Sequence, residues 1–416
     1  MPRVALLPWG DLIEDYLDAI GLTFDELRTE QTGGWLFGYV EALRTAGVES
    51  VLVCVSRSAT EPRRTRHEPT GTTLWVLPPT AAFRHARARL GATRRASPLV
   101  SYLATPLRPL AAVLREERCD AVLCQEYEYP RFDACVLVGR LAGVPVHATF
   151  QGGTDPGGPL QRRVRAWALH RAGALLVGPL AERARVQARH GLPADRVVQV
   201  FNPVDLRQWE PVDRAAARAA LGIPETASVV AWHGRVELRH KGVDVLAEAW
   251  RRVGEALPEV DLRLTLMGTG PDAAELGLLV DQLGLRGVQW IDEYVLDRDA
   301  IRRFLGAADV YAFPSRHEGF PLAPLEAMAS GLPVVAAAAP GVRDIFGPDD
   351  GHGGVVVPTG DPGALADALL DLLDDPARRR RLGGRGRARI EDAFSLQAVG
   401  AAIAEALFPA GRSPAG

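Results

Sequence analysis

The chain has 416 residues, of which 47% are hydrophobic and 24% are charged, and its formal net charge is -3. This ordinary globular composition and this length predict two domains, because one hydrophobic core rarely extends beyond about 300 residues. The nearly balanced charge gives no overall field for nucleic acid, and no apolar run approaches the roughly 18 residues of a membrane span. The first residues lack the pattern of a secretion signal, so we expect a cytoplasmic protein.

Short apolar runs alternate with amphipathic stretches along the chain, which is the pattern of β–α units that build parallel sheets. In the first half, residues 4–8 predict a strand, the acidic segment 11–30 has helical spacing, and Gly33-Gly34 opens a helix. Further strands are expected at residues 50–56, 73–77, 121–124, 146–150, 174–177 and 197–200. The four cysteines form no Cys-x2-Cys pair, so we expect buried thiols in a reducing compartment rather than a metal site.

A second series of β–α units follows a proline-containing connection at residues 203–226. Its strands are expected at residues 228–232, 262–267, 288–291, 310–313, 334–337 and 354–357, and a last helix at 396–407. We therefore expect one domain over residues 1–204, a second over 205–390, and a C-terminal helix and tail over 391–416. That last helix is a candidate to pack back on the first domain. Ligands of such sheets bind outside the carboxyl ends of the strands.

The most informative segment is SRHEGFPLAPLEAMA at residues 315–329, which leaves an expected strand and enters an expected helix. The start of a helix presents unpaired amides and a positive dipole, which favour anions such as phosphates. Glu318 in the loop and Glu326 on the helix can each accept hydrogen bonds from vicinal hydroxyls of a ribose or a hexose. Two solvated glutamates beside a helix start are the alternative, and the spacing alone does not exclude it.

A single lysine, Lys241, occurs among the 48 basic residues, which suggests that a point charge is needed at that position. It stands shortly after His233-Gly234-Arg235, which follows an expected strand, and just before an expected helix. The planar fork of Arg235 and the mobile ammonium of Lys241 both suit a diphosphate. Glycine permits close approach of the backbone to such a ligand, and glycines recur at Gly268 and Gly270 after the next strand.

Together these residues resemble the retaining glycosyltransferases of family 4, which have the α/β GT-B fold of two facing Rossmann-like domains with a deep interdomain cleft. The resemblance is dense from residue 228 to residue 357 and thin in the first half. It implies a hexosyltransferase that uses a nucleotide diphosphate sugar as co-substrate, needs no other cofactor and retains the anomeric configuration. The acceptor would be a hydroxyl of a small molecule, a glycan or a lipid-linked compound, bound to the N-terminal domain.

The resemblance also implies roles for single residues. Arg235 and Lys241 would hold the diphosphate and stabilise the leaving group, Glu318 would meet the donor sugar, and Glu326 would meet the ribose. The other donor-binding residues that it implies are Gly33, Gly34, Gly234, Gly268, Gly270, Gly319, Phe320 and Leu322. Two cations beside the diphosphate make a metal unnecessary. The one Asp-x-Asp sequence, Asp297-Arg298-Asp299, is interpreted as the start of a helix.

Relatives commonly have a histidine after the strand expected at residues 146–150, where this chain has Gln151-Gly152. Glutamine cannot act as a general base, so this position is assigned to the acceptor or donor-sugar side without an acid–base role.

Arginine-rich stretches occur at residues 84–95 and 162–165. They have two open interpretations: a weak association with the inner face of a membrane, or a face of arginines that is simply solvated. A phosphorylase, a nucleotide-sugar epimerase and a non-catalytic sugar-nucleotide binding protein also stay open. A dinucleotide oxidoreductase is disfavoured, because no G-x-G-x-x-G follows the first strand.

Overall fold

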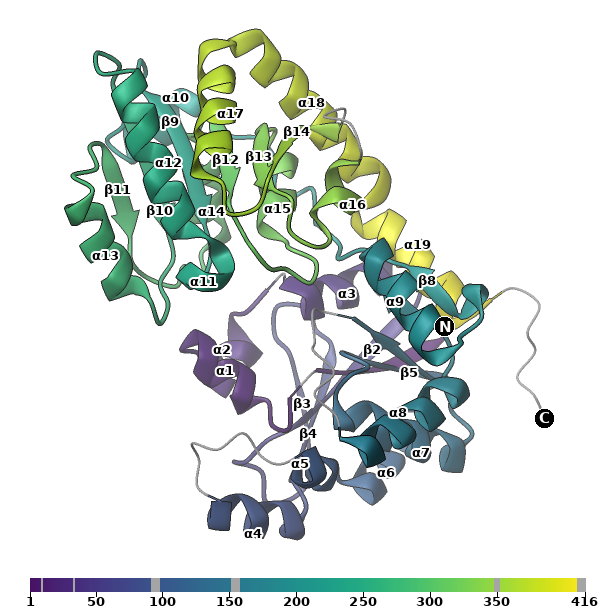
Figure 1. Cartoon of the computed structure of the whole chain (residues 1–416). Coiled ribbons are helices and arrows are strands. Elements are labelled where there is room, and N and C mark those ends of the chain that lie inside the picture. The colour runs from purple at the N-terminus through teal and green to yellow at the C-terminus, as the bar shows by residue number, and fades with distance from the viewer. Residues whose placement is uncertain (9, 33, 91–97, 151–157, 348–351, 410–416) are drawn as a thin grey trace. The chain divides into compact units, whose positions relative to one another are not determined.

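The computed structural model describes residues 1–8, 10–32, 34–90, 98–150, 158–347 and 352–409 (Figure 1). The chain divides into two compact units, unit 1 (Met1–Pro203 with Leu396–Gly416) and unit 2 (Val204–Ser395). The C-terminal helix α19 (Leu396–Leu407) packs on α3 (Gly34–Thr45) of unit 1. The helices approach closely at Gly400, where a Cβ would lie only 2.0 Å from the carbonyl oxygen of Ala42.

Unit 1 is built on an eight-stranded sheet in the order β3-β4-β2-β1-β5-β6-β7-β8. The strands are β1 (Arg3–Leu7), β2 (Glu49–Val55), β3 (Arg63–Arg66), β4 (Thr73–Leu77), β5 (Ala121–Cys124), β6 (Val146–Thr149), β7 (Leu175–Val177) and β8 (Val197–Gln199). All pairings are parallel except the one between β3 and β4. The sequence did not predict β3, because RRTR contains no apolar residue. Its arginines blunt the edge of the sheet against further strand pairing.

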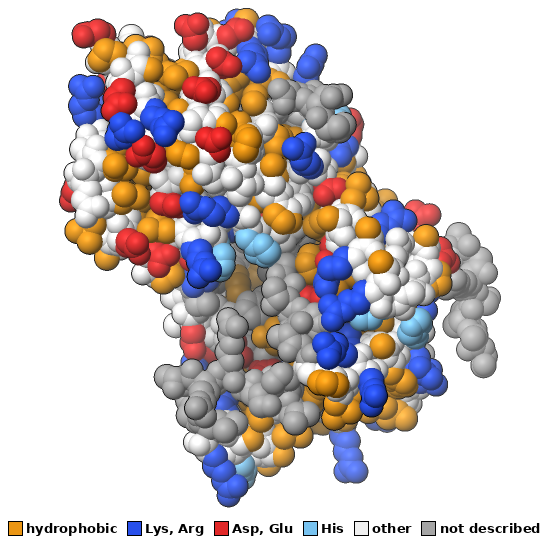
Figure 2. Space-filling model, in the orientation of Figure 1, with side chains coloured by type: hydrophobic (Ala, Val, Ile, Leu, Met, Phe, Trp, Pro, Cys, Tyr) orange, Lys and Arg blue, Asp and Glu red, His pale blue; other side chains and the backbone are white. Residues whose placement is uncertain are grey.

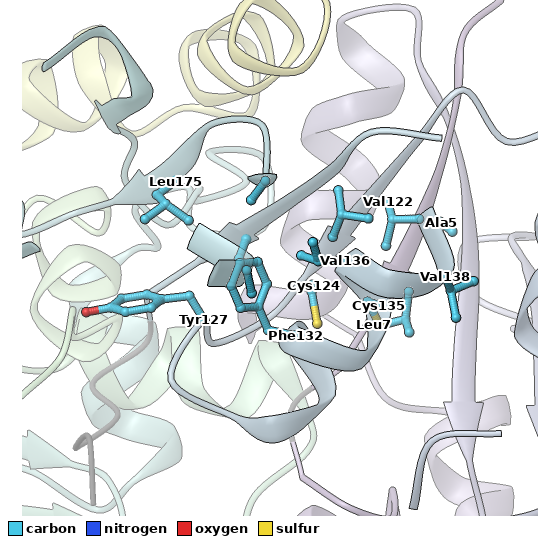
Figure 3. Packing of buried hydrophobic residues seen from close by; sticks show 14 of the residues in the cluster. Ala5, Leu7, Val122, Cys124, Tyr127, Phe132, Cys135, Val136, Val138 and Leu175 are labelled. Carbon is cyan, nitrogen blue, oxygen red and sulfur yellow. The ribbon is translucent and has the colours of Figure 1, made fainter. Parts of the chain in front are cut away.

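The helices of unit 1 flank this sheet. Besides α3 and α19 they are α1 (Glu14–Ile20), α2 (Phe24–Thr29), α4 (Ala81–Leu90), α5 (Pro98–Ala104), α6 (Leu107–Glu116), α7 (Pro130–Ala142), α8 (Pro159–Arg171) and α9 (Leu180–His190). Figure 3 shows Phe132 and Val136 of α7 among core residues from the strands, such as Val122. The cysteines are buried and free, as expected, and burial raises the pKa of the Cys54 thiol to about 12. Such thiols are unreactive packing groups.

The acidic segment 11–30 folds into α1 and α2 and belongs to unit 1. The amide of Ile13 donates to the carbonyl of Val55 at 2.8 Å, which ties the segment to the end of β2. Thr23 and Glu26 form a reciprocal capping box that starts α2. One expected solvated arginine, Arg165, is instead buried against Asp133, with 2.6 Å between Nε and Oδ1.

Unit 2 contains a six-stranded parallel sheet in the order β11-β10-β9-β12-β13-β14. Its strands are β9 (Ser228–His233), β10 (Leu262–Met267), β11 (Val288–Ile291), β12 (Val310–Phe313), β13 (Val334–Ala337) and β14 (Gly354–Val357). Its helices are α10 (Arg214–Ala220), α11 (Leu238–Lys241), α12 (Val243–Ala256), α13 (Ala273–Gln282), α14 (Arg298–Gly306), α15 (Ala323–Ala329), α16 (Val342–Phe346), α17 (Pro362–Asp374) and α18 (Pro376–Ala393). The strand order reverses between β9 and β12, so the loops after these two strands meet at the switch point where such sheets bind ligands.

Candidate functional site

The loops that follow β9 and β12 are joined by hydrogen bonds. The backbone amide of Arg316 donates to the carbonyl of His240 at 2.8 Å. Its guanidinium binds both carboxylate oxygens of Asp244, at 2.7 and 2.6 Å, and the carbonyl of Leu238 at 2.9 Å. Gly242 ends α11 at φ +64°, and a Cβ there would lie 2.2 Å from the carbonyl oxygen of Pro314. A glycine is therefore required for α11 to lie against the end of β12.

This arrangement brings Lys241 to Glu318. The Nζ atom of Lys241 donates to both carboxylate oxygens of Glu318, at 2.8 and 3.1 Å. The Lys241 side chain is 29% exposed and the Glu318 side chain 8% exposed, so the ammonium still reaches solvent while the carboxylate is nearly covered. Lys241 and Glu318 are thus each other's partner in the structure. An anionic ligand at Lys241 must therefore compete with Glu318.

Glu326 lies in a second cluster, on α15. The Nε2 atom of His233 donates to its Oε2 at 2.9 Å, and Arg298 approaches its Oε1 at 3.4 Å. Burial alone would raise the pKa of the Glu326 carboxyl, but the hydrogen bond from His233 and the charge of Arg298 hold that pKa below its ordinary value. Glu326 is therefore an ionised hydrogen-bond acceptor at neutral pH. Arg298 also lies over the ring of Trp209, with its Cζ 5.7 Å from the ring centroid.

The sequence did not assign a partner to Glu326. The prediction that Asp297-Arg298-Asp299 starts a helix is confirmed, since Asp297 caps α14 by accepting from the amide of Asp299 at 2.9 Å. The contact of Arg298 with Glu326 was missed. His233 was noted only as a neighbour of Gly234. Both contacts depend on the strand order, which no local motif contains.

The glycines after β9 and β10 let two stretches of backbone pack against each other. Gly234 and Gly268 have φ values of +152° and +128°. A Cβ on Gly268 would lie 2.0 Å from the carbonyl oxygen of Gly234, and one on Gly270 would lie 2.3 Å from that of Val236. Arg235 projects from this loop half exposed, with its Nη1 3.0 Å from Oε1 of Glu237.

The other predicted site residues lie in several places. Gly319 is partly buried, and the buried ring of Phe320 stacks on Phe394 with centroids 6.0 Å apart. Leu322 immediately precedes α15, whose first turn has no side-chain cap. Gly34 is the first residue of α3 in unit 1. Three predicted residues lie outside the described residues: Gly33, Gln151 and Gly152.

His147, four residues before Gln151 in the sequence, does not replace the histidine expected after β6 from the family resemblance. His147 is buried within β6 and accepts a hydrogen bond from the amide of Ala174 at 2.9 Å. Burial lowers the pKa of its imidazole to about 4. His147 is therefore neutral at pH 7 and has a structural role.

The surface around α11 is rich in basic and histidine side chains. Figure 2 shows blue and pale blue side chains gathered on the edge of unit 2 where Figure 1 places α11. The residues of α11 include Arg239, His240 and Lys241. Within the described ranges, no three His, Cys, Asp or Glu side chains group so that they could hold a metal ion. None of the helices described combines the length and the apolar character that a membrane crossing requires.

Comparison with known structures identifies the fold class. Sucrose-phosphate synthase from Thermosynechococcus elongatus matches with a TM-score of 0.72 and 22% identity, over 97% of this chain and 98% of that chain. Anabaena HepE in complex with UDP-glucose matches with a TM-score of 0.70 and 16% identity, over 98% and 99% of the two chains. The expected GT-B fold is confirmed.

Sequence comparison identifies the family. The family described as "Glycosyltransferase Family 4" matches residues 36–208, and "Glycosyl transferases group 1" matches residues 227–375. The chain belongs to glycosyltransferase family 4. It is similar to D-inositol 3-phosphate glycosyltransferase of Nocardioides sp., with 37% identity over 198 residues, 44% of this chain and 43% of the relative. It is also similar to a GDP-mannose-dependent mannosyltransferase acting on monoacylated phosphatidylinositol monomannoside in Corynebacterium glutamicum, with 33% identity over 50% and 53% of the two chains. The matches thus span about half the length of these relatives.

Proposed function

We propose that this chain is a retaining glycosyltransferase that moves a hexosyl unit from a nucleotide diphosphate sugar to an acceptor hydroxyl. Unit 2 would bind the donor, and unit 1 would bind the acceptor. The observation that carries the proposal is a pair of contacts beside the switch point of the unit 2 sheet. The ammonium of Lys241 binds the nearly covered carboxylate of Glu318, and His233 at the end of β9 holds the carboxylate of Glu326. Family membership and the UDP-glucose complex of a protein with the same fold support this assignment.

The chemistry assigns a separate task to each group. When the bond between the anomeric carbon and the diphosphate breaks, negative charge grows on the departing phosphate oxygen. Lys241 and Arg235 stabilise that charge as fixed cations. Glu318 accepts hydrogen bonds from the transferred sugar and opposes the positive charge that develops on its ring. Glu326 accepts hydrogen bonds from the ribose hydroxyls, which take no part in the reaction.

We propose that transfer needs no divalent metal, because the two cations supply the charge that a bound magnesium would otherwise provide. The expected result is that transfer, measured as release of nucleoside diphosphate, keeps its rate in excess EDTA. The assay uses UDP-, GDP- and ADP-hexoses with a panel of hydroxyl acceptors. Complete loss of activity in EDTA, restored by magnesium or manganese, would show that a metal bridges the diphosphate. A chain that binds donor but releases no product with any acceptor would instead be a sugar-nucleotide binding protein.

The names of the relatives suggest where the acceptor panel should begin. D-inositol 3-phosphate and a phosphatidylinositol mannoside are named in them, so cyclitols and their lipid-linked forms are the first acceptors to test. Unit 1 would bind such an acceptor at the carboxyl edge of its own sheet.

A weak association of unit 1 with an anionic membrane surface is a second part of the proposal. Helices α7 and α8 expose arginines together with large apolar side chains, namely Arg140, Leu141, Leu160, Arg162 and Arg163. Basic residues near anionic lipid contribute about 1 kcal/mol each, and salt screens the attraction. Binding to phosphatidylglycerol vesicles in co-sedimentation should therefore fall as the salt concentration rises. Equal recovery with neutral phosphatidylcholine vesicles would contradict this part.

A further inference from the structure

His233 ends β9 with its imidazole fixed on two sides. The Tyr311 hydroxyl donates to the His233 carbonyl at 3.1 Å and accepts from its amide at 3.3 Å, which fixes the backbone. The two rings meet edge to face, with centroids 5.4 Å apart and an angle of 65°. The imidazole is 11% exposed, and its Nε2 lies 2.9 Å from Oε2 of Glu326. The imidazole is thus fixed with one nitrogen against the carboxylate.

We infer that His233 is a positioning residue: it holds the Glu326 carboxylate in the orientation that accepts the two ribose hydroxyls of the donor. This inference rests on the proposed role of Glu326. A carboxylate has about four acceptor sites. His233 occupies one on Oε2, and Arg298 lies near Oε1 at a longer 3.4 Å, so sites remain on both oxygens for a vicinal pair of hydroxyls.

His233 also keeps those sites available. A buried carboxyl that loses its donors tends to bind a proton, and a protonated carboxyl gives up an acceptor site to become a donor itself. Arg298 alone approaches only one oxygen, and it leaves the carboxylate free to turn about its last side-chain bond. The Nε2–H donor therefore fixes both the charge and the direction of Glu326.

Two amide substitutions distinguish the contribution of Nε2 from that of Nδ1. His233→Gln places an amide nitrogen near the position of Nε2, whereas His233→Asn places one near the position of Nδ1. His233→Leu removes both ring nitrogens and so the donor to Glu326. The measurement is the dissociation constant, by calorimetry, of UDP or GDP, whichever binds the wild-type chain more tightly. It is repeated with the 2′,3′-dideoxy form of the same nucleotide, and the preference is the ratio of the two constants.

The preference for the ribonucleotide should be about tenfold lower in His233→Leu and His233→Asn than in the wild-type chain. His233→Gln should keep the wild-type preference. A general loss of packing would weaken both nucleotides equally and leave the ratio unchanged. Tyr311→Phe is the matched control, because it removes the contact with the His233 backbone but keeps the imidazole. It should keep the preference even if it lowers the melting temperature.

The outcomes distinguish this inference from the proposed function. If Glu326→Gln loses the preference while His233→Leu and His233→Asn keep it, the inference is wrong and the donor site stands. Equal ratios in His233→Gln and His233→Asn also overturn it, and this comparison remains informative if His233→Leu fails to fold. If the wild-type chain has no preference for the ribonucleotide, or binds neither nucleotide, the proposed role of Glu326 fails and the inference fails with it.

Discussion

Replacing Lys241 by alanine should lower turnover with the cognate donor about a hundredfold, which corresponds to about 2.7 kcal/mol of transition-state stabilisation. The reason is that the ammonium is one of only two cations assigned to the departing diphosphate. Steady-state rates at saturating donor measure the effect. Lys241→Arg should recover only part of the rate, since a planar fork does not replace a point charge.

Arg239→Ala is the matched control for this substitution. Arg239 is an exposed cation of the same short helix, two residues before Lys241, and it has no role in the proposed site. Its replacement should change turnover by less than about twofold, because charges that remain in solvent are screened. Thermal unfolding of both variants checks the fold, since Lys241→Ala leaves the covered Glu318 carboxylate without its ammonium. Near wild-type turnover in a folded Lys241→Ala chain would mean that the leaving group is stabilised elsewhere.

The two glutamates should separate donor affinity from turnover. Glu326→Gln should weaken donor binding about 10- to 150-fold with little change in turnover, because its bonds to an unreacting ribose are equal in the ground and transition states. Glu318→Gln should depress turnover more than donor affinity, because the carboxylate matters most when positive charge develops on the sugar. Donor dissociation constants and turnover numbers of both variants measure this difference.

The ion pair between Glu318 and Lys241 adds a second readout. Free nucleoside diphosphate carries no sugar for Glu318 to bind, but it competes with Glu318 for Lys241. Glu318→Gln should therefore bind the nucleoside diphosphate at least as tightly as the wild-type chain. A pattern in which Glu326→Gln keeps donor affinity while Glu318→Gln keeps turnover is incompatible with the proposed roles.

The strands were the most predictable part of the fold. In a parallel sheet covered on both faces, strands are nearly continuous apolar runs, and residues 262–267, 310–313 and 334–337 are strands with the predicted bounds. Elements without that signal were missed. The edge strand β3 is RRTR, and α18 contains Gly383, Gly384 and Gly386, which predict a weak helix. Tertiary packing explains Gly383, since a Cβ there would lie 2.0 Å from the carbonyl oxygen of Gly331, whereas a Cβ on Gly384 would meet nothing within 4 Å.

The candidate site was predictable where a local motif contains its chemistry. The lone Lys241 and the pair of glutamates stand in such motifs, and their positions at strand ends follow from the β–α pattern. The partners of these groups could not be predicted. His233, Arg298 and Glu326 come from three segments that meet only because β9 lies beside β12 in the sheet. The clamp of Arg316 on Asp244 likewise joins residues 72 positions apart.

The central claim is that unit 2 binds a nucleotide diphosphate sugar through Lys241 and Glu326. The most direct test is thermal unfolding of the chain in EDTA with each member of a panel of such sugars. A donor at about a hundred times its dissociation constant stabilises the folded chain by about 2.7 kcal/mol, which raises the melting temperature by an easily measured amount. We predict that at least one sugar nucleotide gives this shift with the wild-type chain, and that the shift shrinks in Lys241→Ala and Glu326→Gln. No shift with any sugar nucleotide, or an equal shift in all three chains, would contradict the claim.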